Sequence, residues 1–392
     1  MLAHSPPLPI VIDYQGTDIT AEDEEAIILA LQQRNRVRRI RFNLPVLELQ
    51  KLILAIDGEY PILEYLIFVE PPKDRSTRMI LPETFQTPHL RHLAIGCSIP
   101  MRFPLLGTTV GLATLNLGLH HPSTYFQPTI LLQSLSSMPQ LEMFLIFFLF
   151  PVSNRDVERQ LMRTPITTVT HITLPNLRAF AFQAVSAYSE AVLSRITASR
   201  LEDFQICYPE QLTLSVPHLA QFIGKTENFK FERIEFRFFG DLVAVVVVNS
   251  SEANMQQDNI FSVIVDCWHL DWQVSSMTRI SNALRQVLSA VEHLTLVYED
   301  HSESSEEHNE VDRTEWRKLL RSFNKVKTLH IEDELVVGLS RCLRFDDGEH
   351  ALEVLPELQQ LICPSSSNAN DTFTPFIDAR QNVGRPVTLV KQ

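Results

Sequence analysis

The segment CWHLDW, from Cys267 to Trp272, holds the densest group of side chains that could take part in chemistry. Cys267, His269 and Asp271 are the residue types of a nucleophile with its base, or of a metal ligand set. They would share one face only if the segment were a regular strand, and no second His or Cys follows at zinc spacing. We therefore expect a structural corner packed by the two tryptophans. The alternative hypothesis is an enzyme with Cys267 or His269 as its reactive group.

Other histidines favour chemistry even less. His120 and His121 are adjacent, so on a strand they would point opposite ways and form a poor chelate; we expect a loop. His301 and His308 flank carboxylates in an acidic segment, where a solvated loop is the expectation and weak metal binding the alternative. The chain has no H-E-x-x-H, no G-x-S-x-G and no glycine-rich phosphate motif. The sequence thus predicts no enzyme, no catalytic residue, no metal and no cofactor.

One basic segment, RNRVRRIRF from Arg34 to Phe42, stands out from an acidic chain. Arg39 and Arg41 alternate with Ile40, so they should share the exposed face of an early strand. An acidic partner or a phosphate is one interpretation. We favour a solvated face offset by acidic residues of the helix that precedes it, namely Glu22, Asp23, Glu24 and Glu25.

Composition limits the classes of function. The chain has 392 residues, 45% of them hydrophobic and 21% charged, which predicts a folded protein. Its net charge of −13 argues against nucleic-acid binding and against docking on anionic membranes. The five cysteines are scattered and form no C-x-x-C, which indicates reduced thiols in a cytoplasmic or nuclear protein. The longest apolar run, Leu141 to Val152, is too short to span a bilayer.

A hexapeptide of the form L-x-x-L-x-L, in which other apolar residues can replace Leu, recurs along the chain. Its repeats must form the elements that position the candidate residues named above. Successive copies start 22 to 36 residues apart, with one double gap that holds the off-pattern apolar run Phe261–Cys267. Recurrence at such a period is typical of a solenoid. The copies are Val37–Phe42, Leu63–Phe68, Leu90–Ile95, Leu112–Leu117, Leu141–Ile146, Leu177–Phe182, Leu201–Ile206, Phe231–Phe236, Val291–Leu296, Val326–Ile331 and Leu358–Cys363.

Segments with helical spacing of apolar residues precede most copies, beginning with one that Thr20 should cap. Helix, turn and strand therefore alternate. The fold class that this predicts is α/β: a single leucine-rich-repeat solenoid over 1–392, with a curved parallel sheet and helices outside. The Asn or Cys that usually stands three positions after the phrase is missing in the copies that start at Leu63, Leu90, Leu112 and Leu141. We therefore expect the solenoid to be irregular. Loops are expected at 249–259 and 299–315.

Strand alternation predicts which side chains face the concave side of this solenoid. The fourth and sixth residues of the phrase should point into the core, and the third, fifth and seventh to the inner curve. We expect this surface to be continuous and to bind a protein partner. The predicted partner-binding residues are Tyr65, Ile67, His92, Thr114, Asn116, Met143, Leu145, Phe147, Asp203, Gln205, Arg233, Glu235 and Arg237.

Several phrases resemble the repeat region of the F-box proteins of mushroom-forming fungi. They are LPETFQTPHLRHLAI, HHPSTYFQPTILLQSLSSMPQLE, TLPNLRAFAF, DCWHLDWQVSS and EHNEVDRTEWRKLLRSF. The resemblance implies a module that selects the substrate of a cullin–RING ubiquitin ligase. The F-box that docks on the ligase adaptor is not seen, because only a short segment precedes the first strand-like run and the LPET at Leu81 lies before a strand phrase. The adaptor is therefore a partner only if an F-box exists upstream. The alternative is a stand-alone interaction scaffold, and the bound protein is unknown.

Overall fold

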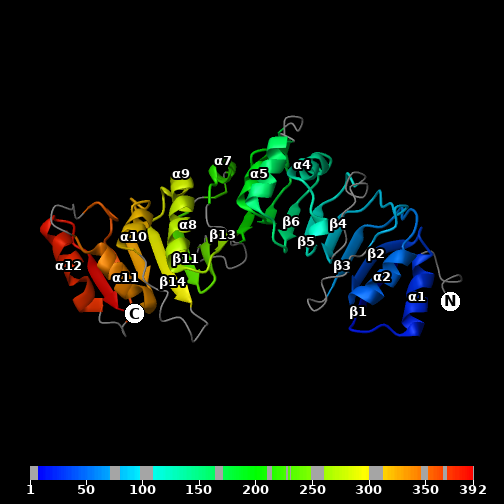
Figure 1. Ribbon diagram of the computed structural model, residues 1–392, viewed down its shortest axis with the longest axis horizontal. Coiled ribbons are helices and arrows are strands. Elements are labelled where there is room, and N and C mark those ends of the chain that lie inside the picture. Colours follow the sequence, from blue (N-terminus) through cyan, green and yellow to red (C-terminus); the bar gives the residue numbers. More distant parts are fainter. Residues whose placement is uncertain are drawn as a thin grey trace. The chain divides into compact units, whose positions relative to one another are not determined.

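The structure, a computed structural model, describes residues 8–70, 80–97, 109–163, 171–209, 214–226, 228–229, 231–248, 260–299, 312–345, 352–364 and 369–391. The chain divides into two compact units, Met1–Leu201 and Glu202–Gln392 (Figure 1). Each unit combines a mostly parallel sheet with helices, so the predicted α/β class is confirmed.

The sheet of the first unit is parallel, and its strands follow one another in chain order. The strands are β1 (Ile10–Gln15), β2 (Val37–Asn43), β3 (Tyr65–Val69), β4 (His92–Gly96), β5 (Thr114–Leu119), β6 (Met143–Phe148) and β8 (Ala179–Gln183). Two short strands, β7 (Ile172–Thr173) and β9 (Ile196–Thr197), pair separately. The helices are α1 (Ala21–Leu31), α2 (Val46–Ala55), the 3-10 helix η2 (Pro122–Thr124), α4 (Pro128–Ser136), α5 (Asn154–Arg163) and α6 (Ser186–Leu193).

The second unit has the strand order β10-β13-β12-β11-β14-β15-β16-β17. The strands are β10 (Asp203–Tyr208), β11 (Arg233–Phe239), β12 (Leu242–Val248), β13 (Ile260–Asp266), β14 (His293–Glu299), β15 (Thr328–Ile331), β16 (Gln360–Cys363) and β17 (Thr388–Lys391). The helices are α7 (Pro217–Gly224), α8 (Leu270–Ala283), α9 (Arg285–Leu288), α10 (Arg313–Leu320), α11 (Asp333–Leu343) and α12 (Ala369–Asn382).

Every copy of the hexapeptide forms a strand, and in all but the first the strand starts at the third residue of the phrase. The residues before the strand form a tight turn. In the copy that opens with Leu90, the Leu90 N–H donates to the Thr87 carbonyl at 3.2 Å, and Leu63 and Leu141 make the same bond to the residue three positions back. Proline at the second position of such a turn, as at Pro88, supplies the φ that the turn requires.

A second repeated feature ties adjacent copies together within each unit. The carbonyl of Glu64 accepts two N–H groups of the following strand, from Arg91 and His92, both at 2.9 Å. The Arg91 carbonyl in turn accepts from Ala113 and Thr114 at 2.8 and 2.9 Å. The bonds recur at corresponding residues in the second unit, so register is fixed at the edge where the strands begin.

The core forms as the phrase predicts. Residues at the first, fourth and sixth positions are buried, as at Leu90, Leu93 and Ile95, which are 1% exposed or less. In register across β3, β4 and β5, Leu66 pairs with Leu93 and Leu93 with Leu115, so the apolar side chains form continuous rows. Figure 1 shows α4 and α5 together on one side of β5 and β6.

Each segment with helical spacing contributes to a helix, but the predicted segment 189–199 is helical only up to Leu193 and then contains β9. Thr20 caps α1, because its hydroxyl accepts the Asp23 N–H at 3.1 Å. Helices α5, α11 and α12 were not predicted. Within the described ranges, no helix is long and apolar enough to cross a membrane.

The double gap in the repeat has a structural cause. The run Phe261–Cys267 contributes β13, but an unpredicted strand, β12, pairs antiparallel with both β13 and β11. Two strands therefore lie between β10 and β11, which come from copies that are consecutive in the sequence. The chain enters β13 by reversing from β12 instead of through a helix and turn, which is why β13 lacks the phrase.

The two predicted loops fall largely outside the described residues, which exclude 249–259 and 300–311. The predicted bounds 299–315 were too wide at both ends. Glu299 is the last residue of β14. Arg313 to Glu315 already belong to α10, because the Asp312 carboxylate accepts the Thr314 N–H at 2.9 Å and starts the helix there.

Candidate functional site

One face of the first unit's sheet is half exposed, and it is the face that the alternation predicted. Its outer rows are in direct register. Tyr65, His92, Thr114 and Met143 form one row, and Ile67, Ala94, Asn116 and Leu145 the next. We call this surface the open face; it consists of Arg39, Arg41, Tyr65, Ile67, Val69, His92, Ala94, Gly96, Thr114, Asn116, Gly118, Met143, Leu145 and Phe147. It contains all eight predicted partner-binding residues of the first unit.

The first row of the open face is held together by side-chain contacts. The Arg39 guanidinium lies over the Tyr65 ring at 5.2 Å, and the Tyr65 and His92 rings stack at 4.3 Å. His92 Nδ1 lies 3.0 Å from Thr114 Oγ1. Cation–π, stacking and hydrogen-bond contacts thus fix four consecutive side chains from four strands before any partner arrives.

Burial also sets the charge state of this row. Desolvation is the largest effect and lowers the pKa of His92 below its ordinary value; the charges of Glu142 and Glu64 oppose it, and those of Arg91 and Arg39 add to it. His92 is therefore neutral at pH 7. The row presents a single positive charge, at Arg39, beside two stacked rings.

The other side of the open face is apolar and partly exposed. Met143 is 41% exposed and Val69 37%, and Leu145 and Phe147 are half buried. Between them, Gly96 and Gly118 bring backbone to the surface: a Cβ added to Gly118 would lie 3.5 Å from Gly96 Cα. The open face therefore offers a polar, aromatic row next to an apolar area.

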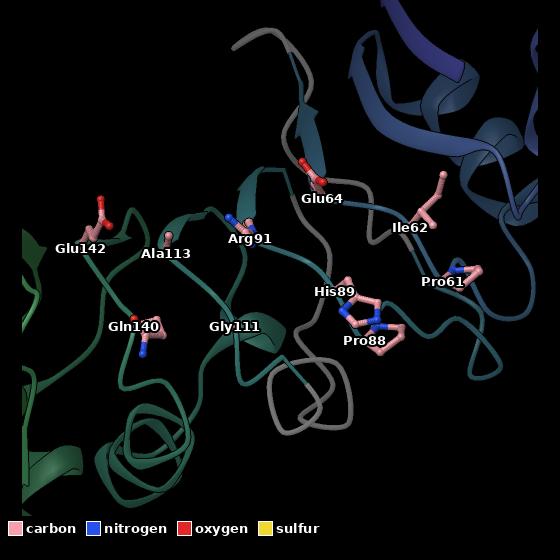
Figure 2. Close-up of a pocket in the computed structure, with 10 residues that line it drawn as sticks. All are labelled: Pro61, Ile62, Glu64, Pro88, His89, Arg91, Gly111, Ala113, Gln140 and Glu142. Carbon is pink, nitrogen blue, oxygen red and sulfur yellow. The ribbon is translucent and has the colours of Figure 1, made fainter. Parts of the chain in front are cut away.

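A cavity of about 580 Å³ lies at the edge where β3 to β6 begin, next to the first row (Figure 2). Its acidic and arginine residues are Glu64, Arg91 and Glu142, which precede three of these strands; Ala113 is the corresponding residue before β5. Figure 2 shows Ala113 between Arg91 and Glu142. Ala113 and Gly111, in the turn before it, both line this cavity, and a Cβ added to Gly111 would meet no atom within 4 Å. Its remaining lining residues are Pro61, Ile62, Pro88, His89 and Gln140.

Sequence reasoning missed this cavity, although a signal was present. The second residue of the phrase is charged in Arg38, Glu64, Arg91 and Glu142, and only the copy from Leu112 has Ala113 there. Arg38 and Glu64 form an ion pair at 2.9 Å. Positive and negative residues therefore alternate along this edge, and Ala113 is the one position in the series without a charge.

The five predicted residues of the second unit lie at exposed or half-exposed strand positions, but on two strands that are not adjacent. Asp203 and Gln205 lie on β10 and Arg233, Glu235 and Arg237 on β11, but β13 and β12 separate these strands. The expectation that these copies are neighbours is wrong, since the β12 hairpin intervenes. Asp203 accepts the Ile260 N–H at 3.2 Å, and Arg237 forms an ion pair with Glu235.

The CWHLDW segment is a corner, as predicted, and not a strand. Strand β13 ends at Asp266 and α8 begins at Leu270. Cys267 is 4% exposed, and its burial, with a smaller effect of Asp266, raises the pKa of its thiol to about 12. A thiol that is protonated at neutral pH is a poor nucleophile.

The predicted role of the tryptophans was wrong. Trp268 is 69% and Trp272 42% exposed, so neither packs the corner; Leu270 is buried there instead. The His269 ring meets the Trp272 ring edge to face at 4.6 Å.

The remaining candidates have structural roles. His121 accepts the Ser123 N–H at 3.1 Å and caps η2 in a loop, as expected. Arg41 lies 3.8 Å from Asp13 of β1, and Arg34 and Arg38 pair with Asp57 and Glu64, so carboxylates outside α1 offset these three arginines of the basic segment. His301 and His308 lie outside the described residues. No group of three or more His, Cys, Asp or Glu residues able to hold a metal occurs in the described part of the chain.

Fold and site define an α/β protein with a mostly parallel sheet whose one face is half exposed and chemically varied. Comparison of the sequence with models of known families and with curated proteins finds no match.

Proposed function

We propose that this chain is a protein-binding module built as an irregular leucine-rich-repeat solenoid, similar in role to the substrate-recognition part of a fungal F-box protein. The observation that carries the proposal is the preformed row Arg39–Tyr65–His92–Thr114 on the open face. Side chains already held in place lose little conformational entropy when a partner binds.

The repeated local geometry supports the repeat assignment. Most turns before a strand close in the same way, and where two consecutive copies are paired, most strand starts are bonded to a carbonyl of the previous copy. Copies whose core positions are uniform and whose outer positions differ are what a solenoid uses for recognition. Here the outer row changes from Arg39 through an aromatic pair to Met143.

The chemistry of the open face favours a protein as the partner. Aromatic residues, Met and Arg are enriched in protein interfaces, and all occur here beside half-exposed aliphatic residues. The net charge of −13 opposes binding to nucleic acid.

A comparison of two surface variants tests the proposal. The variant Y65A/H92A/M143A removes the centre of the open face. The matched control L29A/L47A/L54A removes apolar side chains that are 49 to 67% exposed on α1 and α2. In affinity capture from fungal extract, we expect partners that the wild type and the control both retain and that the open-face variant loses at least tenfold. Equal capture by all three proteins would place binding elsewhere.

The ubiquitin-ligase role rests on the sequence resemblance and needs its own test. The product of the full native transcript is mixed with the purified ligase adaptor. Association is expected if this is an F-box protein, and its absence removes the ligase role. If captured partners have the same cellular half-life with and without the gene, the chain is a stand-alone scaffold.

A further inference from the structure

The corner between β13 and α8 exposes the two largest apolar side chains that the second unit has on its surface. Of the three tryptophans in the chain, Trp316 is 2% exposed and packs in the core, whereas Trp268 and Trp272 are 69% and 42% exposed. Exposed tryptophans on one short segment are the residue type that most often dominates binding energy at interfaces.

Buried hydrogen bonds hold the backbone of this corner in place, so the positions from which the two tryptophans project are fixed. Gln273 is 1% exposed, and its Nε2 donates to the carbonyls of Phe239 and Cys267 at 2.7 and 2.9 Å. The Cys267 N–H donates to the Asp241 carbonyl at 3.0 Å, which ties the corner to the β11–β12 turn. The His269 ring contacts the edge of Trp272 and helps to orient it.

Three aspartates belong to the same corner as the tryptophans. Asp241 is joined to it through its backbone carbonyl, and Asp266 and Asp271 lie near enough to the Cys267 thiol to act on it electrostatically. Asp271 also accepts the Trp272 N–H at 2.9 Å. Among the described residues, neither Asp241 nor Asp271 forms an ion pair with Lys or Arg.

A buried acceptor at this corner also lacks a donor. Because Nε2 of Gln273 faces two carbonyls, its Oε1 is the other end of the amide, and this oxygen has no hydrogen-bond partner in the described part of the chain. This oxygen is itself out of a ligand's reach, but the carboxylates near the corner favour a ligand that brings hydrogen-bond donors and positive charge.

We propose that Trp268, Trp272 and the carboxylates of Asp241, Asp266 and Asp271 form a docking site for a basic segment of a partner protein. An arginine or lysine side chain stacks on an indole ring through a cation–π contact and lies within reach of the carboxylates. The site is in the second unit and is independent of the open face. The same negative charge disfavours anionic membranes as the occupant.

The test uses fluorescein-labelled peptides with three arginines alternating with alanine, and the same peptide with citrulline in place of arginine. Citrulline keeps the shape but removes the charge. We expect the wild-type chain to bind the arginine peptide and not the citrulline peptide, as measured by fluorescence anisotropy. The variant W268A/W272A should weaken binding at least tenfold. The variant D241N/D271N should weaken it and also reduce its dependence on salt.

The control M162A/D156N removes an 81% exposed apolar residue and an exposed carboxylate from α5 in the first unit, and should bind like the wild type. Circular dichroism checks that each variant is folded. Equal binding by the wild type and W268A/W272A overturns the proposal, as does equal binding of the citrulline peptide. Concentration-dependent self-association that W268A/W272A abolishes, measured by sedimentation velocity, would make a second copy the occupant and also overturn it.

Discussion

Tyr65 and His92 lie face to face on neighbouring strands, with ring centroids 4.3 Å apart and ring planes 8° from parallel. Their backbones are direct partners in the β3–β4 register, so the stack follows from the alignment of two copies of the repeat. The partial burial of His92 is the main reason why its pKa is lowered.

We expect this histidine to make stability depend on pH. Its pKa in the folded chain lies below that of an unfolded histidine, about 6.5. Between these two values the unfolded chain binds more protons, so stability rises with pH and is lost as pH falls below about 6.5. Urea midpoints measured from pH 5 to 8 should show this slope, and H92Q should flatten it. A slope that survives in H92Q would contradict the assignment.

The alternation along β5 predicts opposite effects for adjacent residues. Leu115 is fully buried, and L115A should destabilise the first unit by about 3 to 5 kcal/mol through lost burial and the cavity left behind. Its neighbour Asn116 faces the open side, and N116A should change stability by about 0.5 kcal/mol or less. Urea unfolding followed by circular dichroism measures both. If the two variants lost similar amounts of stability, Leu115 and Asn116 would not lie on a buried and an exposed face of β5.

Much of the fold follows from the sequence because the phrase encodes two local properties at once. Apolar residues at the fourth and sixth positions give the strand alternation, and the preceding proline or polar residue gives the turn. Strand β12, with the sequence LVAVVVV, has no alternation to reveal it. Its insertion between β11 and β13 depends on pairing between distant segments, which periodicity does not report. Helix α5 was missed for a different reason: it is mostly polar, and only Val157 is buried.

The candidate site, like the fold, could be predicted only in part from the sequence. Alternation indicated that Tyr65, His92 and Thr114 share a face, but their contacts depend on a register that the turns and backbone hydrogen bonds set. The exposure of Trp268 and Trp272 ran against expectation, since large aromatic residues usually pack inside. The buried amide of Gln273, and not an indole ring, holds that corner.

Arg380 should be essential to the end of the second unit. It is fully buried, and its guanidinium donates to the carbonyls of Leu355, Pro356, Leu358 and Arg385 at 3.0 to 3.3 Å. It thereby ties α12 to the turn before β16, where Leu355 has a left-handed φ of 50°.

Replacing this guanidinium leaves buried carbonyls without donors, so R380M should cost about 3 to 5 kcal/mol. R380K should fall between R380M and the wild type, because an ammonium group has fewer donors and a different geometry. Urea unfolding gives the free energies, and hydrogen exchange at β17 should speed up in both variants. The exposed neighbour Gln381 provides the control Q381A, which should be as stable as the wild type. If R380M were also as stable as the wild type, the hydrogen bonds of Arg380 would contribute nothing to stability and the prediction would be wrong.

The thiols should be nearly inert while the protein is folded. Burial is the main cause that raises the pKa of Cys207 and Cys267 to about 12 and of Cys363 to about 11, and Cys97 and Cys342 are fully buried. At pH 8 a thiol of pKa 12 is about one part in ten thousand thiolate, the reactive form. We expect an aromatic disulfide reagent to label the native chain at least a hundredfold more slowly than the chain in urea, where all five thiols react. The variant Ser136→Cys, at an exposed position at the end of α4, is the positive control and should add one fast thiol. Rapid native labelling that peptide mapping assigns to Cys267 would contradict this prediction and would restore the hypothesis of a reactive cysteine in the CWHLDW corner.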